Sequence, residues 1–507
     1  MQGLTSIASL MFVKEFLDLS AEFMASLFFW LTLPWALKMP VGNVVDVFWN
    51  YRRWFLVLGI GLVTLSNLLM VLLLLYPDQF GGRNQVSMWF ALCAALPPIG
   101  FVLQDVVADA LTVETASRKE TRSKGSPGDR FHTEIQTLGR VFFLFGTVLT
   151  WLINIVFLRD VADFSLAERG RIFALIHVVG LLGPGVALGG VVAHFYFEKS
   201  RKASMGRDSA RSCSSFSSFD NWVVGGGLAY VVIILVIKAV AGNAAEAFVF
   251  SLTFVATSLL FGHMVKRAQL TRDEVRSAIG TAIILWSFMA MPEVGIGLQW
   301  WQIDRLGFDA QFLAVLRLTG QLASILVLAL VVPRFLLSSI NLVALMSWLI
   351  FLRALFFLPD LALYYGLQES LSELSLGILG PRSLALIDNA SEGPLNQIAA
   401  IPILVWAAKH APIALKATYF AVASSLMNCS SQFKMLVTKH INQMFVVNRE
   451  VLDTSSGMVM LPEDYDQLGS ILLIVLALNT FIPLIVLMLV SRYLLANKLD
   501  SSRRLSN

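Results

Sequence analysis

Apolar stretches long enough to cross a membrane follow one another along almost the whole chain, with short polar segments between them. An α-helical span needs about 20 mostly apolar residues. Stretches close to this length cover residues 22–38, 54–76, 86–111, 138–158, 171–195, 221–241, 244–264, 278–299, 311–332, 338–358, 388–408, 417–437 and 468–491. This pattern predicts an all-α polytopic membrane protein.

The first residues, "MQGLTSIASLMFVKEF", are also apolar, but Lys14 and Glu15 interrupt them too early for a full span. The segment either lies at the membrane surface or is the second half of a helix. We favour the second interpretation, which gives about 14 spans with the first one apparently truncated.

Composition agrees with this class. Of the 507 residues 57% are hydrophobic and 14% charged, with a mean hydropathy of +0.72, whereas a soluble protein has about 25% charged residues. The three cysteines and six histidines are scattered, so we predict no metal site and no cofactor. An integral membrane enzyme, such as a lipid transferase or hydrolase, would need a clustered nucleophile, base or metal, and is therefore disfavoured.

Lysine and arginine fall mainly on every second loop, as expected when those loops face the cytoplasm. The alternation holds only if 221–241 and 244–264 are separate spans, and it places both termini in the cytoplasm. We predict an N-terminal helical bundle (1–195), a Ser-rich cytoplasmic linker (196–220), an inserted helix pair (221–264), a C-terminal helical bundle (265–492) and a cytoplasmic tail (493–507).

A charged motif follows the stretch at 22–38. In "VGNVVDVFWNYRR", Gly42, Asp46, Arg52 and Arg53 form a G-x-x-x-D…R-R pattern that resembles the loop motif of the major facilitator superfamily. Glycine lets two helices approach closely, and the charged groups can lock the cytoplasmic face. The two arginines would also serve as a simple positive anchor, but the spacing and position favour a gate.

Three carboxylates lie where "FVLQDVVADALTVE" leaves the membrane. Asp105 and Asp109 share one helix face, and Glu114 follows them. An aspartate at the bilayer centre costs roughly 2.5–3.5 kcal/mol, but near a helix end a partner such as Arg140 or Arg52 offsets a smaller cost. The acids are either a salt-bridged helix terminus or a gate that binds a proton or changes its pairing during transport. The deeper Asp105 is the better candidate for the second role.

The stretch "MPEVGIGLQWWQIDRLGFD" predicts a broken helix. Pro292 removes a backbone hydrogen bond, and Gly295 and Gly297 tolerate irregular dihedral angles. Broken helices in transporters expose backbone groups to the substrate. Glu293, which we expect to be an unpaired carboxylate beside the break, is the best single candidate for a binding residue.

Gln299 and Trp300 follow the break and are further candidate substrate contacts. The commoner role of tryptophan at a helix end is an interfacial aromatic belt, which we expect for Trp300 and Trp301. Stacking of one of them on a substrate is the alternative.

Arg317 lies inside the following stretch and is our candidate cation for an anionic substrate. We expect Lys238, Arg353 and Lys434 near helix ends, from which a long side chain reaches the membrane surface at little cost.

In "LIDNASEGPLNQ", polar residues recur at helical spacing, so this face needs partners or water. It is expected to line the mouth of a cavity, with Asn389 and Gln397 as candidate substrate contacts.

Four segments, "QDVVADALTVE", "LPWALKMPVGNVVD", "WWQIDRLGFDAQFLAVLR" and "APIALKATYFAVASSLMN", resemble the folate–biopterin transporter family, a branch of the major facilitator superfamily. The resemblance runs from residue 2 to about 445. It implies two six-helix bundles around a central cavity and secondary, proton-coupled transport of pterins and folates. Its acidic element falls on Asp105, Asp109 and Glu114, and its arginine after the "LGF" turn falls on Arg317. Lys416 and the extra pair at 221–264 depart from the family pattern.

Taken together, these patterns predict a secondary active transporter of pterin- or folate-type solutes, driven by protons and working by alternating access. The alternative is a 14-span exporter or a carrier of another organic anion or metabolite. The expected partners are a small-molecule substrate (folate, biopterin or similar), protons and the lipid bilayer, without nucleic acid. The expected location is a bacterial inner membrane or a plastid or plasma membrane.

Overall fold

The computed structural model describes residues 2–17, 19–122, 129–204, 218–267, 271–330, 341–410, 416–452 and 459–505. Its helices and strands are α1 (Gln2–Phe16), α2 (Ala21–Ala36), α3 (Lys38–Val47), η1 (Trp49–Tyr51), α4 (Arg52–Leu75), η2 (Pro77–Phe80), α5 (Arg83–Arg122), α6 (Asp129–Phe157), η3 (Val161–Asp163), α7 (Leu166–Gly180), α8 (Leu182–Ser204), α9 (Ser218–Val240), η4 (Gly242–Ala244), α10 (Ala245–Arg267), α11 (Arg272–Met289), α12 (Ile296–Leu306), α13 (Ala310–Leu330), α15 (Leu342–Tyr364), α16 (Gln368–Leu374), α17 (Pro381–His410), α18 (Lys416–Met444), β1 (Val451–Leu452), β2 (Val459–Leu461) and α19 (Leu468–Leu505).

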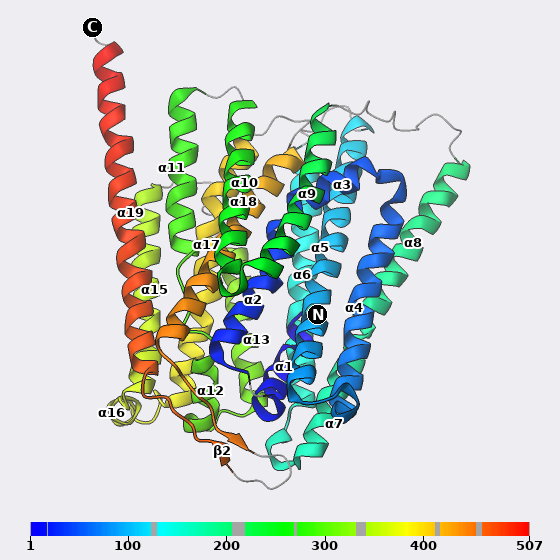
Figure 1. Cartoon of the computed structure of the whole chain (residues 1–507). Helices are drawn as coiled ribbons and strands as arrows, with labels where there is room; N and C mark the ends of the chain where they lie inside the picture. The colour runs from blue at the N-terminus through cyan, green and yellow to red at the C-terminus, as the bar shows by residue number, and fades with distance from the viewer. Residues whose placement is uncertain are drawn as a thin grey trace. The chain divides into compact units, whose positions relative to one another are not determined.

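The predicted helical class is confirmed, because the described residues are helical apart from turns and one small hairpin of β1 and β2 (Figure 1). Seven helical stretches in the described part are long and apolar enough to cross a membrane. These are Arg52–Leu75, Asn84–Asp109, Phe142–Asp163, Leu166–Phe197, Ala310–Leu330, Leu342–Tyr364 and Leu468–Arg492. The total of about 14 spans stays a prediction.

Two expected spans are divided by bends. The stretch at 22–38 is split at Leu37 into α2 and α3, close to Pro34 and Pro40. The stretch at 171–195 is split at Leu181 into α7 and α8, just before Pro184. Proline at or near each bend removes a helical hydrogen bond, which explains why hydrophobicity alone placed one helix where there are two.

The chain clusters into two compact units. Unit 1 comprises 1–12, 30–143 and 163–249, and unit 2 comprises 13–29, 144–162 and 250–507. The predicted linker at 196–220 falls largely on 205–217, outside the described residues. The expected inserted pair consists of two helices, α9 and α10, but the domain boundaries stay a prediction.

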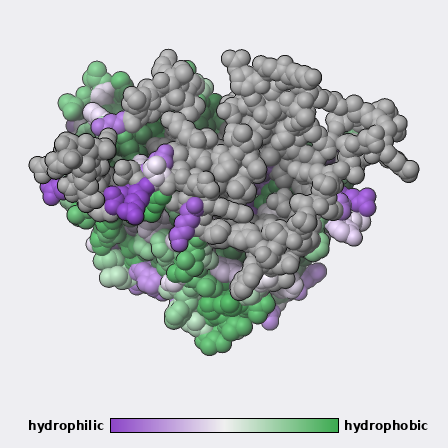
Figure 2. All heavy atoms as spheres, turned by 90° about the horizontal axis from the view of Figure 1, so that it is seen from above, coloured by the Kyte–Doolittle hydropathy of each residue, from purple (hydrophilic) through white to green (hydrophobic). Residues whose placement is uncertain are grey.

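Many large apolar side chains are exposed. Val240 is 80% exposed, Val186 75%, Val156 70%, Leu259 70% and Phe142 66%. In the end-on view of Figure 2, hydrophobic side chains cover broad parts of the described surface and hydrophilic ones form separate patches. A soluble monomer rarely exposes so much contiguous apolar surface, so these side chains fit contact with lipid.

Unit 1 is organised by the close approach of α4 and α5, which lie side by side in Figure 1. A Cβ added at Gly59 would meet the Gly100 carbonyl oxygen at 2.5 Å, and one added at Gly100 would meet the Gly59 oxygen at the same distance. Membrane helices associate through such small residues because backbone contact replaces a missing hydrophobic drive.

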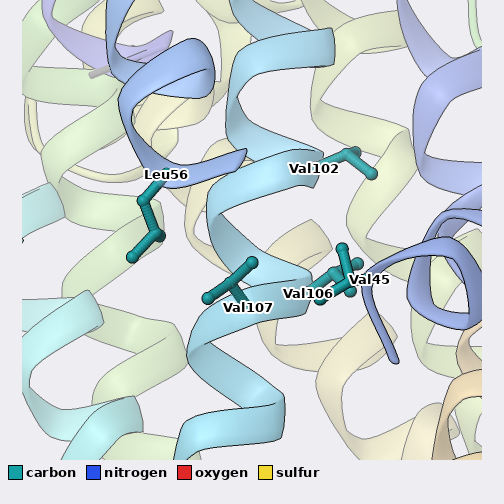
Figure 3. Packing of buried hydrophobic residues seen from close by; sticks show 5 residues of the cluster. All are labelled: Val45, Leu56, Val102, Val106 and Val107. Atoms are coloured by element: carbon teal, nitrogen blue, oxygen red, sulfur yellow. The ribbon is translucent and has the colours of Figure 1, made fainter. Parts of the chain in front are cut away.

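A buried apolar cluster secures the same unit where α3, α4 and α5 meet. It consists of Val45, Leu56, Val102, Val106 and Val107 (Figure 3). Val45 of α3 packs near valines of α5, so the cluster fixes how these two helices face each other. The carboxylates of α5 occupy positions next to these valines.

In unit 2, α15 packs against both α17 and α19, and α17 packs against α13. The contact between α13 and α17 is close, because a Cβ at Gly320 would meet the Asn389 carbonyl oxygen at 2.7 Å. Through these contacts α17 lies against both α13 and α15, so polar residues of all three helices lie in unit 2.

One end of unit 2 is tied by a polar group around Asp304. Lys14 Nζ lies 2.5 Å from Asp304 Oδ1, and the Tyr465 hydroxyl donates to Asp304 Oδ2 at 2.5 Å. Burial, with the hydrogen bond to Asp304, raises the pKa of Tyr465 above its usual value. Tyr465 follows the β1–β2 hairpin, so this group holds the hairpin against α12.

We expect Gly100→Ala to destabilise the protein, because the added methyl group must force α4 and α5 apart. Overpacking of this kind costs about 1–3 kcal/mol. Gly61→Ala in α4 is the matched control. A Cβ at Gly61 meets no atom within 4 Å, and alanine is a better helix former than glycine. Thermal unfolding of the purified variants in detergent measures both. Equal melting temperatures for the two variants would show that the contact is not tight.

Candidate functional site

The predicted helix break lies between α11 and α12. α11 ends at Met289, α12 begins at Ile296, and residues 291–295 are not helical. Pro292 lacks a backbone N–H, and Gly295 has a φ of 94°, a conformation that residues with a Cβ rarely adopt. The predicted break is therefore confirmed at Pro292 and Gly295, whereas Gly297, which we had included, lies inside α12.

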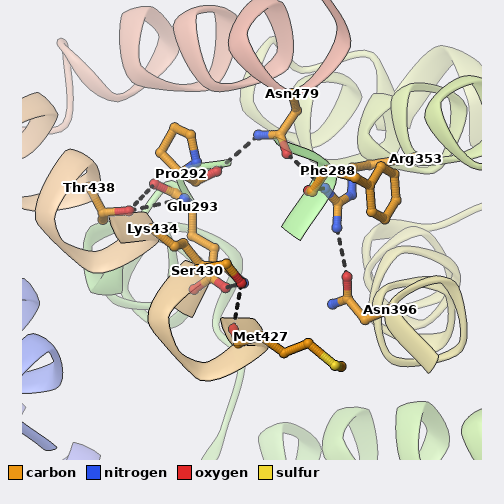
Figure 4. Close-up of polar contacts among 10 residues, drawn as sticks. All are labelled: Phe288, Pro292, Glu293, Arg353, Asn396, Met427, Ser430, Lys434, Thr438 and Asn479. Atoms are coloured by element: carbon orange, nitrogen blue, oxygen red, sulfur yellow. Dashed lines mark hydrogen bonds and ion pairs between the residues drawn. The ribbon is translucent and has the colours of Figure 1, made fainter. Parts of the chain in front are cut away.

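Side chains from α18 and α19 satisfy the backbone groups at the break (Figure 4). The Thr438 hydroxyl accepts from the backbone N–H of Glu293 at 3.0 Å and donates to the carbonyl of the same residue at 3.3 Å. The Asn442 side-chain amide N–H donates to the Val294 carbonyl at 3.2 Å, and that of Asn479 donates to the Pro292 carbonyl at 2.9 Å. Irregular backbone inside a membrane needs such protein partners, so these three side chains make the break possible.

Glu293 is paired, contrary to our expectation of an unpaired carboxylate. Lys434 Nζ lies 2.6 Å from Glu293 Oε1, and the two side chains are 15% and 44% exposed, respectively. The expectation that Lys434 lies near a helix end was also wrong, because α18 continues to Met444. The ammonium group therefore lies within the unit and depends on the Glu293 carboxylate for its charge balance.

Arg353, which we had expected at a helix end, also belongs to this site. It lies in the middle of α15, and its guanidinium donates to the Phe288 carbonyl at 2.6 Å and to Asn396 Oδ1 at 2.7 Å. Its Cζ also lies 3.8 Å from the centre of the Phe288 ring. Phe288 belongs to the last turn of α11, whose carbonyls lack helical partners and favour a cation. Arg353 thus stabilises the end of α11 just before the break.

Arg317 of α13 lies close enough to Glu293 and Asp388 for their charges to interact, and its side chain is exposed. The structure therefore brings together two of our candidate substrate residues, Glu293 and Arg317. On α17, Asn389 and Gln397 are half-buried, as is Gln299 on α12.

The tryptophans after the break do not form an interfacial belt. Trp300 is 1% exposed and Trp301 is 6% exposed. The Arg449 guanidinium carbon lies 5.0 Å from the Trp300 ring centre, and Trp301 contacts Tyr364. Both rings are therefore buried in unit 2, because α12 is short and packed rather than a helix end at the surface.

In unit 1, Asp105 and Asp109 share one cation. Lys38 Nζ, at the start of α3, lies 2.6 Å from Asp105 Oδ2 and 2.7 Å from Asp109 Oδ2. The side chain of Lys38 is 14% exposed, that of Asp105 39% and that of Asp109 61%. We had expected Arg140 or Arg52 as the partner and a helix end nearby, but α5 continues to Arg122. Sequence distance hid Lys38, which only the α3–α5 packing brings to these acids.

The other expected gate residues are placed less fully. Arg52 lies 5.7 Å from the Phe195 ring centre and Arg53 lies 5.6 Å from that of Trp54. Three side chains lie outside the described part of the structure, those of Asp46, Glu114 and Arg140. Their roles stay predictions.

The sequence model of the BT1 family matches residues 1–506. A POT family transporter in complex with 5-aminolevulinic acid has a TM-score of 0.61 at 15% identity, over 97% of this chain and 94% of that chain. A POT family transporter in complex with a thioalcohol-conjugated peptide has a TM-score of 0.58 at 13% identity, over 97% and 94%. A mutant of the nucleoside transporter NupG has a TM-score of 0.52 at 13% identity, over 96% of each chain. No curated protein matches the chain.

The expected assignment to the folate–biopterin transporter family is corrected by these comparisons. The matching family model is that of the BT1 family, and the similar solved structures named above are POT family and nucleoside transporters. None of their names mentions a folate or a pterin.

The predicted fold class, a helical membrane protein of the major-facilitator type, is confirmed by the same structures. The protein is an integral multi-pass membrane protein. With the family model covering nearly every residue, the chain belongs to the BT1 family.

Proposed function

We propose that this protein is a secondary transporter that couples proton movement to the transport of a small organic carboxylate, by alternating access. The observation that carries the proposal is the meeting of Glu293, Lys434 and Arg317 at the broken helix. Unwound backbone beside charged side chains is the usual form of a substrate site in secondary transporters.

Arg317 is the natural contact for a substrate carboxylate. Its guanidinium is exposed and makes no ion pair or hydrogen bond with another described residue. Arg353 and Lys434, in contrast, are held by protein acceptors. A planar guanidinium binds a carboxylate through two parallel hydrogen bonds, so an anionic group would find its strongest partner at Arg317.

The Glu293–Lys434 pair provides a second, exchangeable contact. A substrate carboxylate can replace Glu293 beside Lys434, so that the 15% exposed ammonium keeps a counter-charge while the 44% exposed Glu293 carboxylate turns to solvent. A pair that is only partly buried can be separated at moderate cost, whereas a fully buried one would resist exchange. This supports a binding role for the pair as well as a structural one.

The Lys38–Asp105–Asp109 group fits a gate better than a binding site. One cation serves two partly exposed carboxylates, so movement of α3 relative to α5 would break both contacts together. Asp46, Glu114, Arg52, Arg53 and Arg140 remain the expected further members of this gate.

Uptake by the full chain in proteoliposomes tests the function. With the outside more acidic than the inside, we expect accumulation of 5-aminolevulinic acid or short peptides, which carry a carboxylate and belong to the ligand classes of proteins with this fold, in preference to nucleosides, which carry none. Collapsing the pH gradient with an ionophore should remove the accumulation but not exchange. If neither carboxylate class accumulates above protein-free liposomes at any gradient, the proposal is wrong.

For whichever anion is transported, we expect Arg317→Gln to raise the half-saturating concentration roughly tenfold or more, because a hydrogen-bonded charge contact contributes about 1.5–3 kcal/mol. Arg159→Gln is the matched control, since Arg159 is 73% exposed and, within the described part of the chain, forms an ion pair only with its neighbour Asp160. Equal kinetics for the two variants would exclude Arg317 from the site.

Removing one member of the Glu293–Lys434 pair should destabilise the protein more than removing both. We expect Glu293→Gln to cost between the roughly 1 kcal/mol of an exposed pair and the about 3–5 kcal/mol of a buried one, because the Lys434 ammonium remains. The double variant Glu293→Gln, Lys434→Met should recover much of this loss. Thermal unfolding of the single and double variants measures the coupling, and strictly additive effects would contradict a functional pair.

A further inference from the structure

A second acidic group lies in unit 2, on the facing helices α15 and α17. It consists of Asp360 of α15 and Asp388 and Glu392 of α17. Asp360 is 3% exposed, Asp388 is half-buried and Glu392 is exposed. The Oδ1 atom of Asp360 is buried and has no hydrogen-bond partner in the described part of the chain.

The three carboxylates lie close enough for their charges to act on one another. Asp360 interacts with Glu392, and Asp388 interacts with both of the others. Buried carboxylates that share a site cannot all stay ionised, because burial and like charge both penalise the anion. The group therefore needs a cation or a proton.

Cations reach the edges of this group. The positive charge of Arg317 on α13 interacts with the Asp388 carboxylate, and those of Arg353 and Lys434 interact with the Glu392 carboxylate. No described cation is paired with Asp360 itself. α19, which also packs on α15, carries no charged residue between Leu468 and Ser491.

Among the described side chains, the charge balance points to one missing positive charge. Arg317, Arg353 and Lys434 face four carboxylates, which are Glu293 and the three of the acidic group. With every group ionised, the cluster would keep one uncompensated negative charge inside the membrane protein. A single added proton makes it neutral.

We infer that Asp360 is the site at which the coupling proton binds, with Asp388 and Glu392 as the groups that share it. This inference rests on the proposed function. The proton leaves a hydronium ion, forms an O–H bond at Asp360 Oδ1 and leaves water behind. Glu392, the exposed member, is the route by which the proton reaches the buried carboxylate.

Arg317 links this proton to the substrate, because it faces both Asp388 and the substrate position beside Glu293. When a substrate anion takes the guanidinium, Asp388 loses part of its compensation, and the acidic group holds a proton more strongly. Coupling of this kind is reciprocal, so the bound proton also favours the anion. The two then cross together as a symport.

The test is infrared difference spectroscopy on the purified full chain in lipid, recorded while the pH is stepped without any substrate. We expect a carboxylic-acid C=O band that titrates in wild type and is lost in Asp360→Asn. Asp78→Asn, which changes an exposed aspartate of η2, should keep the band. Asp360→Glu should retain a band with a shifted midpoint, which separates loss of the proton site from misfolding.

The inference is overturned if Asp360→Asn, folded by size-exclusion chromatography, keeps the wild-type band. It is also overturned if sodium chloride at constant pH removes the band while choline chloride does not, because the site would then hold a metal cation. Since no substrate is present, these results are independent of uptake. A band that behaves as expected beside absent uptake would refute the proposed function and leave the proton site standing.

Discussion

Side-chain hydrogen bonds to the unwound backbone between α11 and α12 are the constraint on which the rest of the site depends. Inside a membrane each unpaired backbone group costs several kcal/mol, so a helix can break only where partners are already in place. Thr438, Asn442 and Asn479 supply them from two other helices. The break in turn presents Glu293 to Lys434, so the proposed substrate site depends on the packing of α18 and α19.

The charges in unit 2 follow from the same constraint. Arg353 stabilises the last turn of α11, which makes the break possible, and it also faces Glu293 and Glu392. A cation needed for structure thereby becomes part of the electrostatic balance of the site. Because the balance is shared, a charge gained or lost at one position alters the others, which is the physical basis for coupling an anion to a proton.

The sequence predicts those features whose cause is local. Pro292 and Gly295 restrict the backbone at their own positions, and the predicted break is where they lie. The partners of the charged residues depend on helix packing and were missed. Lys38 reaches Asp105 across a long stretch of chain, and Arg353 was assigned to a helix end because the predicted span stopped at residue 358, whereas α15 continues to Tyr364. Asp360 lies just beyond the predicted end of its span at residue 358, so it carried no signal until α17 was placed beside it.

The two charged groups differ in burial, and burial decides what each can do. In the Lys38 group the carboxylates are 39% and 61% exposed, so water can replace the lysine and each contact contributes about 0–1 kcal/mol. Such contacts break and re-form readily, which a gate requires. Asp360 is 3% exposed, so water cannot replace a missing partner and the carboxylate must be neutralised where it stands. A carboxylate that water cannot reach, such as Asp360, is suited to carry a proton, whereas carboxylates that water solvates readily, such as Asp105 and Asp109, are not.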